Sequence, residues 1–343
     1  MQKRLMPGRL LDDNGCLQEA GYATCPVKEY RRAEVRQGTL RIKEWDYYLI
    51  CNEHFGVALT VADNSYMGLV SISFLDFEQK RETTVSPMTL LPMGRTGMPS
   101  SSEAGDVRFG SRRCQFSFVK EKDRRILTAG MKNFKDGLPI RMKIHLTREP
   151  EDSMVIAVPF RENPRAFYYN RKIIGMRAKG IVEIGSQRFY FQPEDSFGLL
   201  DWGRGVWPYD NTWYWGAAQA LLGDRVFGFN LGYGFGDNSR ATENMLFFDG
   251  RAHKLESVRF LIPGEEEGQT EYMKQWKIVS DDGRLALTFT PILDRSARTS
   301  AGIILSDQHQ VFGHFDGTAV LDDGTRVPVE HMQGFAEKVH NKW

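Results

Sequence analysis

Residues 201–215, DWGRGVWPYDNTWYW, bring together the side chains of this chain that are best suited to chemistry. Four Trp, two Tyr, two Asp and one Arg occupy these fifteen positions. Because Trp and Tyr combine a large apolar surface with one polar group, we expect the segment to line a concave surface. A carboxyl group among such rings is harder to ionise and can serve as a general acid near neutral pH. Asp201 is our first candidate for this acid, and Asp210 is the second.

Two interpretations of this Trp-rich segment are open. In the first, Asp201 and Arg204 form a buried structural pair that holds the loop, and the Trp residues plug one end of a barrel. In the second, at least one polar residue contacts a ligand, because the binding sites of small barrels lie at the loops around the mouth. The candidate ligand-binding residues of the segment are Trp202, Arg204, Trp207, Tyr209, Trp213 and Trp215.

Further polar side chains stand near the ends of expected strands. Glu243, a candidate catalytic residue, and Asn244, a candidate ligand-binding residue, begin an apolar strand. Inward-pointing polar groups need partners at such a place, and Arg204 is a candidate partner for Glu243. In the segment 330–343, His331 and Glu337 are available to face a cavity, and we include His331 among the ligand-binding residues. Solvated surface is the more frequent location of such side chains.

The sequence contains no complete motif for a cofactor. The glycines at 232, 234 and 236 precede a hairpin rather than a helix, so we do not interpret them as a phosphate-binding loop. The seven His residues form no HExxH pattern, and no GxSxG, Cys-His, kinase or P-loop signature occurs. We therefore expect an activity without a metal, a nucleotide or another cofactor.

Composition and charge argue against several classes of partner. With 45 Lys and Arg against 44 Asp and Glu, the net charge is +1, so no global field attracts the protein to nucleic acid. No signal-peptide-like segment and no run of ~18 apolar residues is present, which predicts a cytoplasmic protein without a membrane span. The chain is expected to be a monomer or a homodimer. Four cysteines match no zinc motif and are expected to be reduced: Cys16, Cys25, Cys51 and Cys114.

The elements that must position these residues are β-strands. Segments of alternating, β-branched and aromatic character recur about every 8 to 12 residues between Gly, Asp and Asn, and helical periodicity is nearly absent. Five short turns predict hairpins, because glycine at positive φ matches the twist of the flanking strands. These turns are centred on Gly185, Gly223, Gly250, Gly283 and Gly324.

These hairpins supply roughly eight to ten antiparallel strands, the number that closes a barrel around one small ligand. The first half has weaker turns but a similar series of strand-like segments. We therefore predict an all-β protein of two tandem lipocalin-like antiparallel barrels, with domains at 1–163 and 164–343. The segment 90–106 is rich in Gly, Pro and Ser, and we interpret it as either a functional lid or a disordered loop.

Several motifs along the chain resemble a known bacterial family. They are WDYY at 45–48, FYYNRKIIGMRAKG at 167–180, LDWGRGVWPYDNTWYWG at 200–216, TENMLFFDG at 242–250 and GFAEKVHNKW at 334–343. Together they resemble the family called domain of unknown function 2804, over nearly the whole chain. That family is distantly similar to AttH-like, carotenoid hydratase and tocopherol cyclase proteins, which share paired lipocalin-like barrels with apolar cavities.

The resemblance implies hydration or ring closure of isoprenoid-like substrates. The chemistry shared by such enzymes is protonation of an alkene by a carboxylic acid, with aromatic walls that stabilise the cation. We therefore expect a cofactor-independent lyase or isomerase that acts on a hydrophobic or amphipathic small molecule, with Asp201 as the acid. Arg204 also suits a hydroxylated or carboxylated substrate. Two alternatives are open: a non-catalytic carrier of a lipid or isoprenoid, and a carbohydrate-active protein with paired carboxylates.

Overall fold

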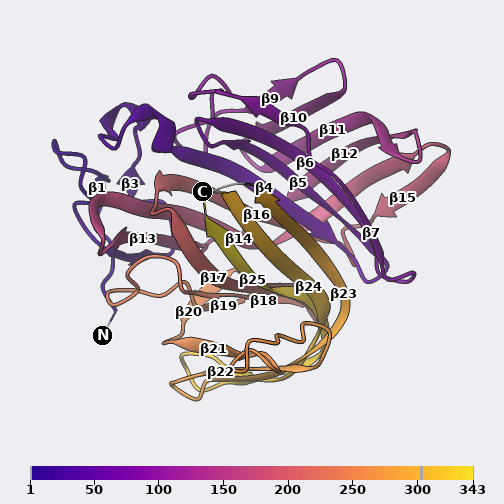
Figure 1. Ribbon diagram of the computed structural model, residues 1–343. Helices are drawn as coiled ribbons and strands as arrows, with labels where there is room; N and C mark the ends of the chain where they lie inside the picture. The colour runs from indigo at the N-terminus through magenta and orange to yellow at the C-terminus, as the bar shows by residue number, and fades with distance from the viewer. Residues whose placement is uncertain (1, 302–303, 343) are drawn as a thin grey trace.

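A computed structural model describes residues 2–301 and 304–342 (Figure 1). This part of the chain is almost entirely β-structure, and its helices are two short 3-10 turns, η1 (Arg32–Glu34) and η2 (Thr39–Arg41). None of its helices has the length and apolar character needed to cross a bilayer. The predicted all-β fold is confirmed, and the four cysteines are free thiols.

The first sheet holds fourteen strands from the N-terminal part of the chain. They are β2 (Gly21–Ala23), β4 (Lys43–Cys51), β5 (Phe55–Asp63), β6 (Met67–Asp76), β7 (Arg81–Val85), β8 (Met88–Leu90), β9 (Val107–Gly110), β10 (Cys114–Lys120), β11 (Arg124–Lys135), β12 (Leu138–Thr147), β13 (Met154–Phe160), β14 (Asn163–Ile184), β15 (Gln187–Phe191) and β16 (Phe197–Val206). The main path runs β7-β6-β5-β4-β16-β14-β12-β11-β10-β9, and the sheet curls so that β7 approaches β11. Beside it, β1 (Gly8–Arg9) pairs in parallel with β3 (Lys28–Glu29).

The second sheet, as far as the chain is described, holds nine strands. They are β17 (Asp210–Leu222), β18 (Arg225–Tyr233), β19 (Met245–Phe248), β20 (Arg251–Lys254), β21 (Val258–Leu261), β22 (Trp276–Ser280), β23 (Leu285–Ala301), β24 (Ile304–Val320) and β25 (Arg326–Lys342). Their order is β20-β19-β18-β17-β25-β24-β23-β22-β21, with β21 approaching β18. Figure 1 shows this orange and yellow sheet packed below the first sheet.

All five predicted hairpins are present. The turns join β14 to β15, β17 to β18, β19 to β20, β22 to β23 and β24 to β25. Glycine is needed in each turn because the backbone there has positive φ. The φ values are 58° at Gly185, 65° at Gly223, 81° at Gly250, 69° at Gly283 and 85° at Gly324.

The change from one sheet to the other falls between Val206 and Asp210. The hairpin at Gly185 therefore belongs to the first sheet, in which β14 and β16 lie side by side between β4 and β12. The predicted division between residues 163 and 164 does not coincide with this change of sheet. Pro164, which is typical of a linker, lies instead at the start of β14, just after the tight turn from β13.

Side chains of β14 alternate between two buried layers. Tyr169 and Ile173 belong to the core enclosed by the first sheet, whereas Tyr168 and Ile174 belong to a layer between the two sheets. We call the enclosed layer the first core and the layer between the sheets the seam. The seam includes Tyr47, Leu49, Tyr168, Leu199, Trp207, Trp215, Phe235, Phe312 and Phe335.

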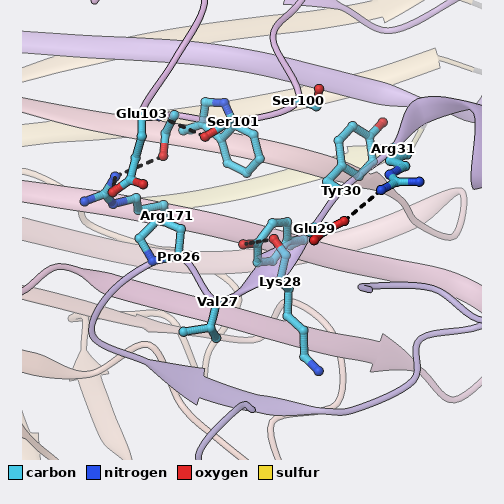
Figure 2. Close-up of a pocket in the computed structure, with 13 residues that line it drawn as sticks. Pro26, Val27, Lys28, Glu29, Tyr30, Arg31, Ser100, Ser101, Glu103 and Arg171 are labelled. Carbon is cyan, nitrogen blue, oxygen red and sulfur yellow. Dashed lines mark hydrogen bonds and ion pairs between the residues drawn. The ribbon is translucent and has the colours of Figure 1, made fainter. Parts of the chain in front are cut away.

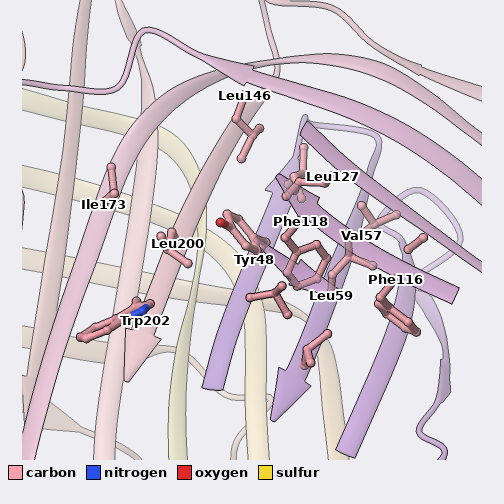
Figure 3. Close-up of a cluster of buried hydrophobic side chains, with 14 of the residues drawn as sticks. Tyr48, Val57, Leu59, Phe116, Phe118, Leu127, Leu146, Ile173, Leu200 and Trp202 are labelled. Carbon is pink, nitrogen blue, oxygen red and sulfur yellow. The ribbon is translucent and has the colours of Figure 1, made fainter. Parts of the chain in front are cut away.

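The first core is filled by apolar side chains that converge from several strands (Figure 3). Tyr48 of β4 meets Phe118 of β10 edge to face, with ring centroids 5.1 Å apart. Leu127, Leu146 and other aliphatic side chains pack around this pair. One face of β4, β14 and β16 is therefore stabilised by close packing inside the curled first sheet, and the opposite face of these strands belongs to the seam.

The segment 90–106 is hydrogen-bonded to the first sheet. The guanidinium group of Arg204 donates to the carbonyl of Pro99 at 2.8 Å, and that of Arg125 donates to the carbonyl of Ser102 at 2.8 Å. These contacts to buried arginines do not agree with the interpretation of the segment as a disordered loop. Its role as a lid stays a prediction.

Replacement of Gly203 tests the packing of β16 against β4. A Cβ atom added at Gly203 would lie 2.0 Å from the indole ring of Trp45. We expect Gly203→Ala to lower the free energy of unfolding by about 1–3 kcal/mol in urea denaturation, because the ring must move. Gly110→Ala is the matched control, because nothing lies within 4 Å of its added Cβ. Equal effects of the two substitutions would contradict the close approach of Trp45.

Candidate functional site

A buried ammonium group lies in the seam among carboxyl groups. Nζ of Lys172 donates to Oε2 of Glu243 at 2.6 Å and to the hydroxyl of Tyr168 at 3.3 Å. It also lies 4.6 Å from the centre of the Trp215 ring. Burial alone would lower the pKa of Lys172, but the negative charges of Glu243 and Asp201 outweigh burial and raise that pKa. Lys172 is therefore a buried cation of the seam, paired with Glu243.

Asp201 lies beside Lys172 on the neighbouring strand β16. Its Oδ2 accepts a hydrogen bond from the indole N–H of Trp45 at 3.1 Å, and its Oδ1 accepts one from the amide of Asn170 at 2.5 Å. The amide oxygen of Asn170 is buried and has no hydrogen-bond donor within the described structure. An acceptor without a donor, next to a carboxyl group, is a place where a water molecule or a ligand hydroxyl binds.

Glu337 of β25 provides another carboxyl group in the seam, and its side chain is almost fully buried. The indole N–H of Trp213 donates to Oε1 at 2.9 Å, and the amide of Gln310 donates to Oε2 at 2.8 Å. Burial raises the pKa of Glu337, although both hydrogen bonds and the charge of Lys172 oppose the shift. A carboxyl group that holds its proton more tightly than usual is suited to general acid catalysis.

Aromatic rings surround these polar groups. Trp215 meets Phe335 edge to face at 4.7 Å between centroids and Tyr47 at 6.0 Å. Phe235 lies 5.3 Å from Trp213 and 5.2 Å from Trp207. Ring faces carry negative electrostatic potential, so walls of this kind attract positive charge. The seam therefore combines a proton-holding carboxyl group, a lysine and electron-rich walls.

The seam opens to the surface between β14 and β18. A pocket of about 270 Å³ lies there, lined by Ile174, Gly228 and Phe247 among others. Ile174 lies on the same face of β14 as Lys172, two residues further along the strand. Ile174 and Phe247 of the seam line this pocket, whereas Lys172, Asp201, Glu243 and Glu337 are not among its lining residues.

Five of the predicted site residues lie in or against the seam. The negative charges of Asp201 and Glu243 both raise the pKa of Lys172. Trp213 and Trp215 form part of the aromatic walls of the seam. Trp207 packs edge to face against Trp45 at 5.4 Å between centroids. The Trp-rich segment therefore contributes to a single buried region, through parts of β16 and β17 and the connection between them.

The first of the two open interpretations, a buried pair of Asp201 with Arg204, does not agree with the structure. Residues 201 and 204 lie on opposite faces of β16, because successive side chains of a strand alternate. Arg204 is fully buried in the first core and pairs with Asp46 at 3.1 Å. The expected contact between Arg204 and Glu243 is also wrong, since Lys172 binds Glu243.

Asp210, the second candidate acid, lies at the exposed start of β17, where its side chain is 56 % exposed. It pairs with His340 at 2.8 Å and with Lys342 at 3.0 Å. Hydrogen bonds from these two residues lower the pKa of Asp210, so the group holds its proton less tightly than usual. Its neighbour Tyr209 is also exposed.

Three further predicted residues lie outside the seam: Trp202, Asn244 and His331. Trp202 is buried in the first core. The side-chain oxygen of Asn244 accepts a hydrogen bond from the backbone N–H of Gly232 at 2.8 Å, so Asn244 supports the backbone. His331 is exposed and stacks on His314, with ring centroids 3.7 Å apart. The structure does not bring these residues together with Asp201.

Sequence reasoning missed Lys172, Asn170 and Gln310. A signal for the first two is present in FYYNRK, where Tyr168, Asn170 and Lys172 follow each other at a spacing of two. In a strand this spacing places three polar groups on one buried face. Gln310 carries no comparable signal, because its role comes from its contact with Glu337 on the neighbouring strand.

The family model described as Domain of unknown function (DUF2804) matches residues 2–343. No curated protein sequence matches the chain.

Several solved structures have a similar fold. An AttH-like protein from Nitrosomonas europaea aligns with a TM-score of 0.58 at 14% identity, covering 92% of this chain and 98% of that chain. Kievitone hydratase from Nectria haematococca aligns with a TM-score of 0.53 at 10% identity, covering 88% of each chain. CghA, solved with Sch210972, aligns with a TM-score of 0.51 at 13% identity, covering 98% of this chain and 97% of that chain. These whole-chain similarities confirm the predicted lipocalin-like fold.

Removal of the lysine charge tests the ionic cluster. We expect Lys172→Met to lower the free energy of unfolding by about 3–5 kcal/mol, because it leaves Glu243 buried without its cation. The double variant Lys172→Met/Glu243→Gln should recover most of this loss, because the buried negative charge is then also removed. Chemical denaturation of both variants measures the difference. Equal destabilisation of the single and double variants would contradict a direct ion pair.

The pH dependence of stability tests the burial of Glu337. The pKa of Glu337 is raised above its ordinary value of 4.5, so its contribution to stability is present at low pH and is lost as the pH rises above that value. We expect the stability of Glu337→Gln relative to the parent protein to increase as the pH rises above the ordinary value of 4.5, by at most about 1.4 kcal/mol per pH unit. Urea denaturation over a series of pH values measures it. A difference that stays constant with pH would refute the raised pKa.

Proposed function

Because this chain belongs to the DUF2804 family and shares the fold of kievitone hydratase and CghA, we propose that it is a cofactor-independent lyase or isomerase. The proposed reaction is hydration, dehydration or cyclisation of an apolar, isoprenoid-like small molecule, and it begins with proton transfer from a carboxylic acid. The proposed site is the seam, where ionisable groups from both sheets meet. Similarity of fold alone does not transfer an activity, so the argument rests on the residues of the seam.

The observation that carries the proposal is the environment of Glu337. This carboxyl group is buried, its pKa is raised, and Trp213 and Gln310 hold it in one orientation. A general acid needs a proton that is present near neutral pH and a rigid position relative to the substrate. Glu337 therefore fits the role of acid, and Asp201, which accepts hydrogen bonds from Trp45 and Asn170, is left for a positioning role.

In the proposed hydration, the Glu337 carboxyl group donates its proton to one carbon of an alkene. The π electrons form the new C–H bond, and the other carbon becomes positively charged. The faces of Trp213 and Trp215 stabilise this cation. A water oxygen then bonds to the cationic carbon and passes one proton to the Glu337 carboxylate, which restores the acid. In a cyclisation, a second alkene of the substrate attacks the cation, and loss of a C–H proton restores the acid in the same way.

Asn170 and Asp201 are proposed to position the water or a substrate hydroxyl. The amide oxygen of Asn170 needs a donor, and an O–H group bound there would lie next to the Asp201 carboxyl group. Lys172 balances the negative charge of Asp201 and Glu243 in the same region. Positioning of this kind contributes to the rate because the nucleophile is already oriented when the cation forms.

The experiment uses the protein with apolar compounds extracted from its own host. The extract is incubated in D₂O, and mass spectrometry detects products with carbon-bound deuterium. We expect the parent protein to form such a product and Glu337→Gln to form it at least about 100-fold more slowly, because the amide cannot supply the proton.

Asp210→Asn is the matched control for this experiment, because it removes an exposed carboxyl group at the end of β17. Its activity should equal that of the parent protein. A Glu337→Gln variant with full activity would overturn the assignment of the acid. A compound that binds to the parent protein and is recovered without deuterium would instead identify a carrier.

A further inference from the structure

A second pocket, of about 360 Å³, lies on the side of the first sheet away from the seam. Tyr169 and Arg171 of β14 and Trp202 of β16 are among its lining residues. Residues 26–31 form one of its walls, and residues 100–103 form another. Figure 2 shows Arg171 and Glu103 at one end of the pocket and Tyr30 at the other. A volume of this size lies in the range of small-molecule sites, about 300–1,000 Å³.

The inner wall of the pocket is aromatic. Trp202 lies between Tyr30 and Tyr169 and meets both rings edge to face, at 6.5 Å and 5.5 Å between centroids. Pro26 and Val27 add apolar surface. These groups suit the flat or unsaturated body of a small molecule.

Arg171 supplies a positive charge that is only partly compensated. Its side chain is 5 % exposed, and its contacts with Glu103 and Glu149 are both long, at 3.4 Å. Glu149 also binds Arg125 through two hydrogen bonds at 3.1 and 3.2 Å and lies 3.5 Å from Lys120. Three cations therefore share one carboxylate, and the other carboxylate at Arg171 is the exposed Glu103. The neutral hydroxyls of Ser153 and Ser102 accept its remaining hydrogen bonds, at 2.9 and 3.1 Å.

Trp202, which lines the pocket, has a side-chain donor without a hydrogen-bond acceptor in the described part of the chain. The indole N–H of Trp202 is buried and makes no hydrogen bond within residues 2–301 and 304–342. A buried donor without an acceptor is rare in proteins and costs free energy. Trp202 therefore offers the pocket its ring surface rather than its covered N–H, and Arg171 supplies the positive charge of the lining.

We propose that this pocket binds a small aromatic or unsaturated carboxylate, whose charged group replaces Glu103 beside Arg171 and whose apolar body lies against Trp202. Glu103 can leave because its side chain is 57 % exposed and stands on a loop. A charged bond to a planar guanidinium group then replaces one long contact. The site is separate from the seam, because Tyr169 and Arg171 face away from the side of β14 that carries Lys172.

The test measures binding of 2-naphthoate and of the neutral, equally sized 2-naphthamide by isothermal titration calorimetry. We expect saturable binding of 2-naphthoate and at least about tenfold weaker binding of the amide, because only the carboxylate pairs with Arg171. Equal affinities for the two probes, or no saturable binding of 2-naphthoate, would overturn the proposal.

Two variants locate the binding. Glu103→Gln should bind 2-naphthoate several-fold more tightly, because it removes the competing carboxylate. Ser101→Trp should abolish binding, because the added ring fills the pocket. Glu183→Gln is the matched control for charge, since Glu183 is paired with Arg188 and is not a lining residue of the pocket. The affinity of this variant for 2-naphthoate should change less than twofold. Unchanged binding by Ser101→Trp would overturn the location.

Glu337→Gln separates this proposal from the function proposed for the seam. This variant should bind 2-naphthoate with the affinity of the parent protein, although it loses the activity measured by deuterium incorporation. Loss of 2-naphthoate binding in Glu337→Gln, with the fold intact by circular dichroism, would overturn the assignment to the pocket beside Arg171.

Discussion

The alternation of side chains along β4, β14 and β16 is the constraint on which both buried layers depend. These three adjacent strands face the first core with every second residue and face the seam with the residues between. A shift of β14 by one residue would exchange the two sets and move Lys172 into the apolar first core. The register of the three strands therefore determines on which side Lys172 and Asp201 lie.

Polar contacts across the seam align the two sheets. Tyr47 donates to Gln310 at 3.2 Å, and Lys172 of the first sheet donates to Glu243, just ahead of β19. Burial of such groups is unfavourable unless their hydrogen bonds are made, so only a narrow range of sheet positions satisfies them. Apolar packing alone would allow the two sheets a wider range of relative positions. We interpret these pairs as groups that select one arrangement rather than as the main source of stability.

The sequence predicted the strands and hairpins well, because glycine turns and alternating patterns are local. It did not predict the change of sheet, since Pro164 is typical of a linker and here begins a long strand. The pairing of Asp201 with Arg204 failed because DWGRG was interpreted as a loop, whereas it is part of β16 and its side chains alternate. The contacts of Lys172 and Glu337 depend on strands far apart in the chain, so no local pattern could predict them.

The position of β25 has a consequence for folding. This strand lies between β17 and β24, so it joins the group β17 to β20 with the group β21 to β24. Its pairing with β24 is a local hairpin, whereas its pairing with β17 joins residues far apart in the chain. Until the second pairing forms, β17 and β25 each keep a free row of backbone donors and acceptors. Pairing at such long sequence separation makes folding slow, and the open edges favour association between incomplete chains. The strand that carries Glu337 is therefore also the one whose pairing with β17 closes these open edges.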